Sequence, residues 1–244
     1  MPQYDLSVVV PCLNEELNIP ELVERLLQTF DAGRLRGELI LVDDGSGDGT
    51  ARVIRAAMRS HPGRVTGVFH ARNHGLAHAW RNGVTVAQAP TVAVMDADLQ
   101  YQPEDVLRLY RTLMDDHGAD IVQGWRSPVG RQRDARYYFS RVFSALLNGA
   151  FGMKLRDNKS GFVCCAKAVF RDLLAYQGRY AFWQCFIMVA AHAKGYSYRE
   201  IEIRFEPRKQ GTSSLAGTGL RAPCRSLLEL LKALWEYRIK PRFD

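Results

Sequence analysis

The chain has 244 residues, a formal net charge of +7, 47% hydrophobic residues and 24% charged residues. Such a composition is typical of a globular protein and excludes wholesale disorder, and the length suits one large α/β domain or a domain with an extension. No apolar run approaches the roughly 18 residues that a membrane-spanning helix needs, and no signal peptide is recognisable. We therefore expect a cytoplasmic protein, whose five cysteines lack metal-ligand spacing and are reduced and buried.

The positive charge is unevenly distributed. Five arginines lie within sixteen residues that contain a single acid, Asp134; they are Arg126, Arg131, Arg133, Arg136 and Arg141. A basic cluster can serve a nucleic acid, an anionic membrane surface or a phosphate-rich substrate. No zinc finger, helix-turn-helix signature or aromatic RNA-binding motif accompanies it, so we expect no nucleic-acid partner.

Apolar runs and helical periodicities alternate along the first half of the chain. Short apolar runs at 6–10, 38–42, 65–69 and 92–95 predict buried strands, each followed by an amphipathic helix. We expect Pro11 to end the first strand, Thr50 to cap the second helix, and Val106, Leu107, Tyr110, Leu113 and Met114 to face inward from the fourth. Strands at 121–124 and 200–206 and a helix toward Phe151 follow. The pattern predicts a doubly wound α/β sheet.

The fourth strand runs directly into Asp96-Ala97-Asp98-Leu99-Gln100. Side chains two apart on an extended chain point to the same side, and ligands of open α/β sheets bind at the carboxyl ends of the strands. Two carboxylates that leave coordination positions open for phosphate suit Mg²⁺ or Mn²⁺ better than zinc. So short a motif can also be a polar strand end or an Asx turn without any function in metal binding.

A second acidic strand end, Asp43-Asp44, precedes a glycine-rich loop without the lysine of a phosphate-binding loop. An acid at this place is suited to accept hydrogen bonds from a base or ribose. His70, His74 and His78 are spaced four apart, but Asn73-Gly75 interrupts the helix that would align them. We therefore do not expect a metal there.

The C-terminal segment, 216–244, is expected to form a basic amphipathic helix outside a main domain of residues 1–215. Its apolar positions recur at helical spacing, namely Leu220, Cys224, Leu227, Leu228, Leu231, Leu234 and Trp235. Such a helix can lie peripherally on an anionic membrane face, or it can pack in the protein or in a homodimer. Glu229 and Glu236, which we place on its polar side, weaken the membrane interpretation.

Six motifs in order from about Leu6 to Ser214 resemble family-2 glycosyltransferases of the GT-A fold, nearest to the dolichol-phosphate mannose synthase and polyprenyl-phosphate glycosyltransferase branch. They are Val10–Glu15, Val42–Ser46, Asp96–Gln100, Gly124–Arg126, Asp157 with Ser160–Phe162, and Arg208 with Gly211. The resemblance implies a mixed sheet flanked by helices. It also implies inverting transfer of one hexose from a GDP- or UDP-sugar to a polyprenyl or dolichyl phosphate.

The resemblance also implies roles for matching positions. The nucleoside would contact Pro11, Leu13, Glu15, Val42 and Asp44; Asp96, Asp98 and Gln100 would hold Mg²⁺ or Mn²⁺, with Ala97 against the sugar nucleotide. Arg126, Arg136, Ser140 and Arg208 would face the diphosphate and the acceptor phosphate. Asp98 and Arg126 would be catalytic, and Asp157 is included as an orienting or basic group. A phosphate monoester acceptor is largely dianionic near neutral pH, so it needs no general base.

Some features depart from that branch, which often has Tyr in place of Leu13 and Gly-Ser-Arg in place of Gly124-Trp125-Arg126. A soluble small-molecule acceptor is therefore the main alternative to a lipid. A sugar-phosphate nucleotidyltransferase would usually carry a lysine-bearing first loop, which this chain lacks. A non-catalytic nucleotide-sugar-binding module would not need the metal-binding set.

Overall fold

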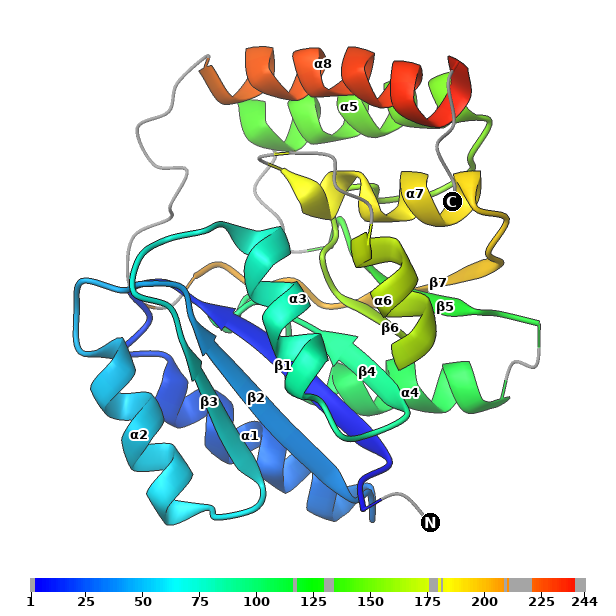
Figure 1. Cartoon of the computed structure of the whole chain (residues 1–244). Coiled ribbons are helices and arrows are strands. Elements are labelled where there is room, and N and C mark those ends of the chain that lie inside the picture. Colours follow the sequence, from blue (N-terminus) through cyan, green and yellow to red (C-terminus); the bar gives the residue numbers. More distant parts are fainter. Residues whose placement is uncertain are drawn as a thin grey trace.

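The computed structural model describes residues 3–115, 118–129, 134–175, 180, 182–208, 210 and 221–239. Its centre is a seven-stranded mixed sheet in the order β3-β2-β1-β4-β6-β5-β7 (Figure 1). The strands are β1 (Leu6–Cys12), β2 (Gly37–Asp43), β3 (Val65–Phe69), β4 (Thr91–Val94), β5 (Ile121–Arg126), β6 (Val163–Ala166) and β7 (Tyr198–Ile203). Only β6 runs antiparallel to its neighbours, β4 and β5, so the sheet is mixed as the sequence predicted.

Helices cover both faces of this sheet. They are α1 (Ile19–Ala32), α2 (Thr50–Ser60), α3 (Leu76–Val86), α4 (Asp105–Asp115), α5 (Ala135–Phe151), α6 (Lys167–Ala175), α7 (Ile187–Ala193) and α8 (Arg221–Leu234). A core with Leu6, Val8 and Val10 lies under α1, α2 and α4, and a second core with Val9 and Val94 lies under α3, α6 and α7. Alternate residues of β1 thus face opposite cores, as a strand buried on both sides requires.

Three local expectations were wrong. Pro11 continues β1 instead of ending it. This is possible because β4 pairs with β1 only as far as Val9, so no hydrogen bond from a backbone N–H at position 11 to β4 is needed. Gly49, not Thr50, caps α2, and the Thr50 hydroxyl accepts a hydrogen bond from the backbone N–H of Glu15 at 2.8 Å. On α4, Leu109 is buried while Met114 is exposed, because the helix presents a narrower face to the sheet than the full apolar pattern suggested.

The sequence left open which side of α8 meets the protein, and the structure shows it. This helix lies alongside α5 at one end of the molecule (Figure 1). Leu230, Ala233 and Tyr237 are buried against the second core. Of the apolar stripe seen in the sequence, Leu227, Leu228, Leu231 and Trp235 are exposed, and the side chains of Leu220 and Cys224 lie outside the described residues. Glu229 and Glu236, expected toward solvent, instead bond to the protein: Glu229 accepts from the Phe182 N–H at 3.3 Å, and Glu236 accepts from the Tyr180 hydroxyl. The acids therefore do not lie among the exposed apolar residues.

No helix among the described residues combines the length and apolar character needed to cross a bilayer.

Candidate active site

Loops that follow the parallel strands bring three acids and one arginine together at the carboxyl edge of the sheet. Asp98 follows β4, and Glu15 follows β1. Arg208 joins them, because its guanidinium donates to Asp98 Oδ2 at 2.8 Å and to Glu15 Oε1 at 3.0 Å. The charge of Arg208 also lowers the pKa of Asp96, whereas the charge of Asp98 raises it, so Asp96 lies near both groups.

A short extension of β7 delivers Arg208 to this place. Phe205 forms a β-bridge with Tyr101, and Glu206 exchanges two hydrogen bonds with Gln100. One of these runs from Gln100 Nε2 to the Glu206 carbonyl at 3.1 Å, so the amide nitrogen of Gln100 is occupied and its oxygen remains for a ligand. The connection explains how Arg208 meets Glu15, 193 positions away in sequence.

The environment of Asp96 and Asp98 fits a divalent cation. Burial raises the pKa of both carboxyls, and the charge of Asp98 raises that of Asp96 further. Asp96 is half-buried and accepts no hydrogen bond from any residue that the structure describes, so its carboxylate is available to a cation. Nowhere in the described part of the chain do three His, Cys, Asp or Glu side chains surround one point suited to a metal. An ion here would thus depend on two carboxylates and on substrate phosphates, which is how proteins commonly bind Mg²⁺.

Asp44, expected at the nucleoside, organises the loop before α3. Its carboxylate accepts from the backbone N–H groups of His74 and Gly75 at 2.9 and 2.8 Å, and it pairs with His70 Nδ1 at 2.7 Å. Asn73-Gly75 does interrupt the helix, yet the three imidazoles meet, with ring centroids 4.7–5.5 Å apart. Asp44 thus fixes a loop whose backbone borders the acidic edge.

The other residues assigned to the donor differ in exposure. Pro11 and Leu13 are half-buried at the end of β1. Val42 is fully buried in the second core, and Ala97 is buried beside Asp96. Among these four positions, the side chains of Pro11 and Leu13 are therefore the better placed to touch a nucleoside.

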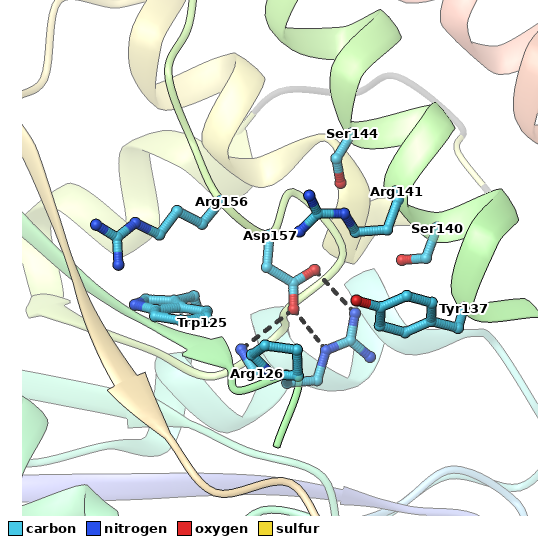
Figure 2. A pocket seen from close by; sticks show the side chains of 9 residues that line it. Trp125, Arg126, Tyr137, Ser140, Arg141, Ser144, Arg156 and Asp157 are labelled. Carbon is cyan, nitrogen blue, oxygen red and sulfur yellow. Dashed lines mark hydrogen bonds and ion pairs between the residues drawn. The ribbon is translucent and has the colours of Figure 1, made fainter. Parts of the chain in front are cut away.

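A separate pocket opens between the end of β5, the first turns of α5 and the loop before β6 (Figure 2). Its lining is cationic and hydroxylic; the residues are Trp125, Arg126, Pro128, Tyr137, Ser140, Arg141, Ser144, Arg156 and Asp157. Ser140, expected at the phosphates, lines this pocket together with Arg126. Arg136 lies in the first turn of α5, and its side chain is outside the described residues.

The floor of this pocket is an ion pair between Arg126 and Asp157. Arg126 Nε and Nη2 donate to the two carboxylate oxygens at 2.6 and 2.9 Å, and the side chains are only 14% and 8% exposed. Burial alone would raise the pKa of Asp157, but the charge and hydrogen bonds of Arg126 outweigh it and lower that pKa below its ordinary value. Of the two roles considered for Asp157, orienting Arg126 therefore fits better than acting as a base.

This lowered pKa has a consequence for acid stability. A carboxyl whose pKa is lower in the folded than in the unfolded chain stabilises the fold above its unfolded pKa of about 3.9, and that contribution disappears as pH falls through the folded value. We expect Asp157→Asn to be less stable than the wild type at pH 7, with the difference in free energy of unfolding shrinking below about pH 4. Urea unfolding at several pH values measures it; a difference that stays constant down to pH 2 would contradict this role.

Four polar residues of the pocket were not assigned to the site from the sequence, although one of them, Arg141, belongs to the basic cluster recognised there. Tyr137, Arg141 and Ser144 share one face of α5 with Ser140, since they lie three or four positions apart. The helical spacing around Ser140 could therefore have identified these three residues from the sequence. Arg156 precedes Asp157, but only the fold shows that its guanidinium stacks over the Trp125 ring, 4.9 Å from the centroid.

Similarity to known proteins shows the family of the chain. The sequence model of "Glycosyl transferase family 2" matches residues 7–177. The chain belongs to this family. Two curated relatives are undecaprenyl-phosphate 4-deoxy-4-formamido-L-arabinose transferases. The enzyme from Shewanella sediminis is 31% identical over 85% of this chain, and that from Proteus mirabilis is 32% identical over 85%. The family 2 chain spans 61–62% of the length of these relatives.

Solved structures agree on the fold. Glucosyl-3-phosphoglycerate synthase from Mycobacterium tuberculosis, in complex with Mn²⁺, UDP and glucosyl-3-phosphoglycerate, has a TM-score of 0.70. The match covers 93% of this family 2 chain and 79% of the other, at 17% identity. The same enzyme with Mg²⁺ and UDP matches with a TM-score of 0.70 at 19% identity. The GT-A arrangement predicted from the sequence is therefore confirmed.

Proposed function

We propose that the chain transfers a single sugar from a nucleotide diphosphate sugar to a polyprenyl phosphate, with inversion at the anomeric carbon and with Mg²⁺ or Mn²⁺ bound at Asp96, Asp98 and Gln100. An acceptor phosphate oxygen forms a bond to the anomeric carbon, and the bond from that carbon to the diphosphate breaks. Family membership supports glycosyl transfer, and the names of the relatives support a polyprenyl phosphate acceptor. The relatives are named for an arabinose derivative, whereas the sequence led us to expect a hexose.

On the donor side, the acidic edge is arranged for a metal-bound diphosphate. The divalent ion would act as a Lewis acid on the leaving diphosphate. Arg208, which pairs with Asp98 and Glu15 within hydrogen-bond distance, can turn its guanidinium to phosphate oxygens when the metal takes over the carboxylate charge. That UDP and Mn²⁺ or Mg²⁺ occur together in structures of similar fold supports the same donor chemistry here.

On the acceptor side, one observation carries the proposal: the pocket contains guanidinium groups without an acidic partner. Arg141 and Arg156 form no ion pair with any residue that the structure describes, and both are exposed at the pocket. Arginine binds phosphate through paired N–H donors. Tyr137 and Ser140 add hydroxyl groups, and Asp157 holds Arg126 in a fixed orientation at the floor. A phosphate monoester fits this set better than a neutral hydroxyl acceptor.

The acceptor preference can be measured directly. A tritiated UDP- or GDP-sugar is incubated with the protein, Mn²⁺ and either a short polyprenyl phosphate or the corresponding polyprenol, and label in the organic phase is counted. We expect label to enter only with the phosphate, and chelation by EDTA to remove it. Equal labelling of the alcohol would contradict the phosphate role of the pocket. Labelling of a soluble phosphate ester but of neither lipid would favour the soluble-acceptor alternative.

We also propose that α8 and α5 rest on an anionic membrane surface. Both helices carry exposed apolar residues, here together called the outer face: Tyr138, Val142 and Leu146 of α5, Leu228 and Leu231 of α8, and Trp235 and Ile239 just beyond α8. Arg225 and Lys232 pair with Glu229 and Glu236 at 3.5 and 3.7 Å, so their charges are balanced. The positive charge of these segments comes from Arg141 on α5 and Arg238 just beyond α8, which are exposed. An amphipathic surface with cations and an interfacial Trp suits anionic lipid. Since α5 also lines the pocket, a lipid phosphate could reach it from that surface.

Vesicle flotation tests this contact. We expect the protein to float with vesicles that contain phosphatidylglycerol and to stay unbound with phosphatidylcholine alone. Leu231→Ser with Trp235→Ser should lower binding to the anionic vesicles by at least about tenfold, because each buried apolar side chain contributes about 1.5–3 kcal/mol. Leu17→Ser with Val86→Ser, which changes exposed apolar residues elsewhere, is the control. A soluble dimer that dissociates in the first pair but not in the control would favour a homodimer at the outer face instead.

A further inference from the structure

The carboxylate of Glu200, which lies outside the pocket, binds the backbone of the segment that carries Arg156 and Asp157. Glu200 on β7 accepts from the Arg156 N–H through Oε2 at 2.8 Å and through Oε1 at 3.0 Å, and Oε1 also accepts from the Asp157 N–H at 3.2 Å. Glu200 is half-buried, and among the described residues it does not line the pocket. Hydrogen bonds to a carboxylate are stronger than those between neutral groups, so this contact fixes the loop firmly.

The loop fixed by Glu200 in turn fixes two arginines. The Asp157 side chain accepts hydrogen bonds from Arg126 through both carboxylate oxygens, and the Arg156 guanidinium packs on the Trp125 ring. Arg126 and Trp125 end β5, which pairs with β7 in parallel register, with Gln123 opposite Glu200. Glu200 therefore ties the loop to the pair of strands that presents Arg126 and Trp125. Figure 2 shows these two side chains beside Asp157 and Arg156.

We propose that Glu200 is a positioning residue for acceptor binding: by holding the backbone of residues 156 and 157, it sets the guanidinium groups of Arg126 and Arg156 at the spacing that an acceptor phosphate requires. The proposal rests on the proposed function for its kinetic consequence, but its structural part does not depend on any substrate. The acids of the edge that would bind the donor follow β1 and β4, and Arg208 is held there by Glu15 and Asp98 and not by the loop that Glu200 fixes. We therefore expect a displaced loop to change the acceptor side selectively.

Glu200→Leu removes the acceptor oxygens, and Glu200→Gln keeps the length and one oxygen at the cost of the charge. Glu202 provides a matched control, because it is exposed on the same strand two positions on and its side chain bonds to no residue that the structure describes. We expect the KM for polyprenyl phosphate to rise about tenfold in Glu200→Leu and by less in Glu200→Gln, with the KM for the nucleotide sugar within about twofold of the wild type. Glu202→Leu and Glu202→Gln should leave both KM values unchanged.

A second measurement needs no catalysis. The Nε–H of a buried arginine that is hydrogen-bonded to a carboxylate exchanges slowly with water and gives a distinct ¹⁵N–¹H signal. The signal of Arg126 is assigned as the one that disappears in Arg126→Lys. We expect this signal to shift or broaden in Glu200→Leu, shift less in Glu200→Gln, and stay in place in Glu202→Leu.

The two readouts separate the failure of each proposal. If the wild type transfers no sugar to a lipid phosphate, the proposed function fails while the Arg126 signal still tests Glu200. An unchanged Arg126 signal in a folded Glu200 variant, or equal increases of the donor and acceptor KM values, would overturn the positioning role. If Glu200→Leu does not fold, Glu200→Gln decides by the same two criteria.

Discussion

Replacing Asp98 with Asn is expected to abolish sugar transfer, a loss of at least about a thousandfold, with less than about 1 kcal/mol change in the free energy of unfolding. The neutral amide cannot supply the negative charge that a divalent ion at a diphosphate requires. The fold tolerates it because burial raises the pKa of Asp98, so the charged form is already disfavoured in the folded chain and a neutral side chain of the same shape costs little.

Transfer rates with Mn²⁺ and urea unfolding of the same preparations measure the two quantities. Asp115→Asn makes the same chemical change on the exposed end of α4 and should leave both unaltered. Substantial turnover in Asp98→Asn would refute the metal assignment. A large loss of stability would instead mean that the pair with Arg208 holds the fold together.

Arg126→Leu is expected to remove transfer and also to cost about 3–5 kcal/mol of folding free energy, because it leaves Asp157 buried without its partner. Both side chains are largely buried, and Arg126 makes three of the hydrogen bonds that the Asp157 carboxylate accepts, one of them from its backbone. Arg126→Leu with Asp157→Asn removes the uncompensated charge, and the amide oxygen can still accept from the Lys159 N–H.

The double variant separates folding from chemistry. We expect it to recover most of the lost stability, because replacing both partners of a buried ion pair is far less costly than removing one. Transfer should stay absent, since the floor of the pocket no longer presents a guanidinium. Recovery of transfer together with stability would show that Arg126 acts only through the fold.

The order and kinds of elements were predictable because the patterns that specify each strand and helix lie within short stretches of sequence. Apolar runs that end in acids, as at Asp43-Asp44 and Asp96-Ala97-Asp98, specify both a buried strand and the edge at which it ends. The sheet therefore follows from the pattern, and the acidic edge follows from the sheet. The pairing of Asp157 with Arg126 was within reach, because both were expected at the acceptor side.

What was missed depends on contacts between distant segments or on the direction in which a helix faces. The pairing of Arg208 with Glu15 and Asp98 needs the bridge between Phe205 and Tyr101, which no local pattern encodes. The side of α8 that packs could not be chosen from the sequence, because an apolar stripe indicates amphipathicity but not which side meets the protein. Leu230 and Ala233 pack there, and Leu231 and Trp235 do not.

Mass spectrometry of the product tests the central claim most directly. The protein with Mn²⁺ is given a pool of UDP- and GDP-sugars and a short polyprenyl phosphate in detergent, and Asp98→Asn is treated in parallel. The account predicts a lipid phosphate heavier by one sugar residue, formed by the wild type alone, whose mass distinguishes a hexose from an arabinose derivative. An unchanged lipid in both samples, with no donor consumed, would contradict it.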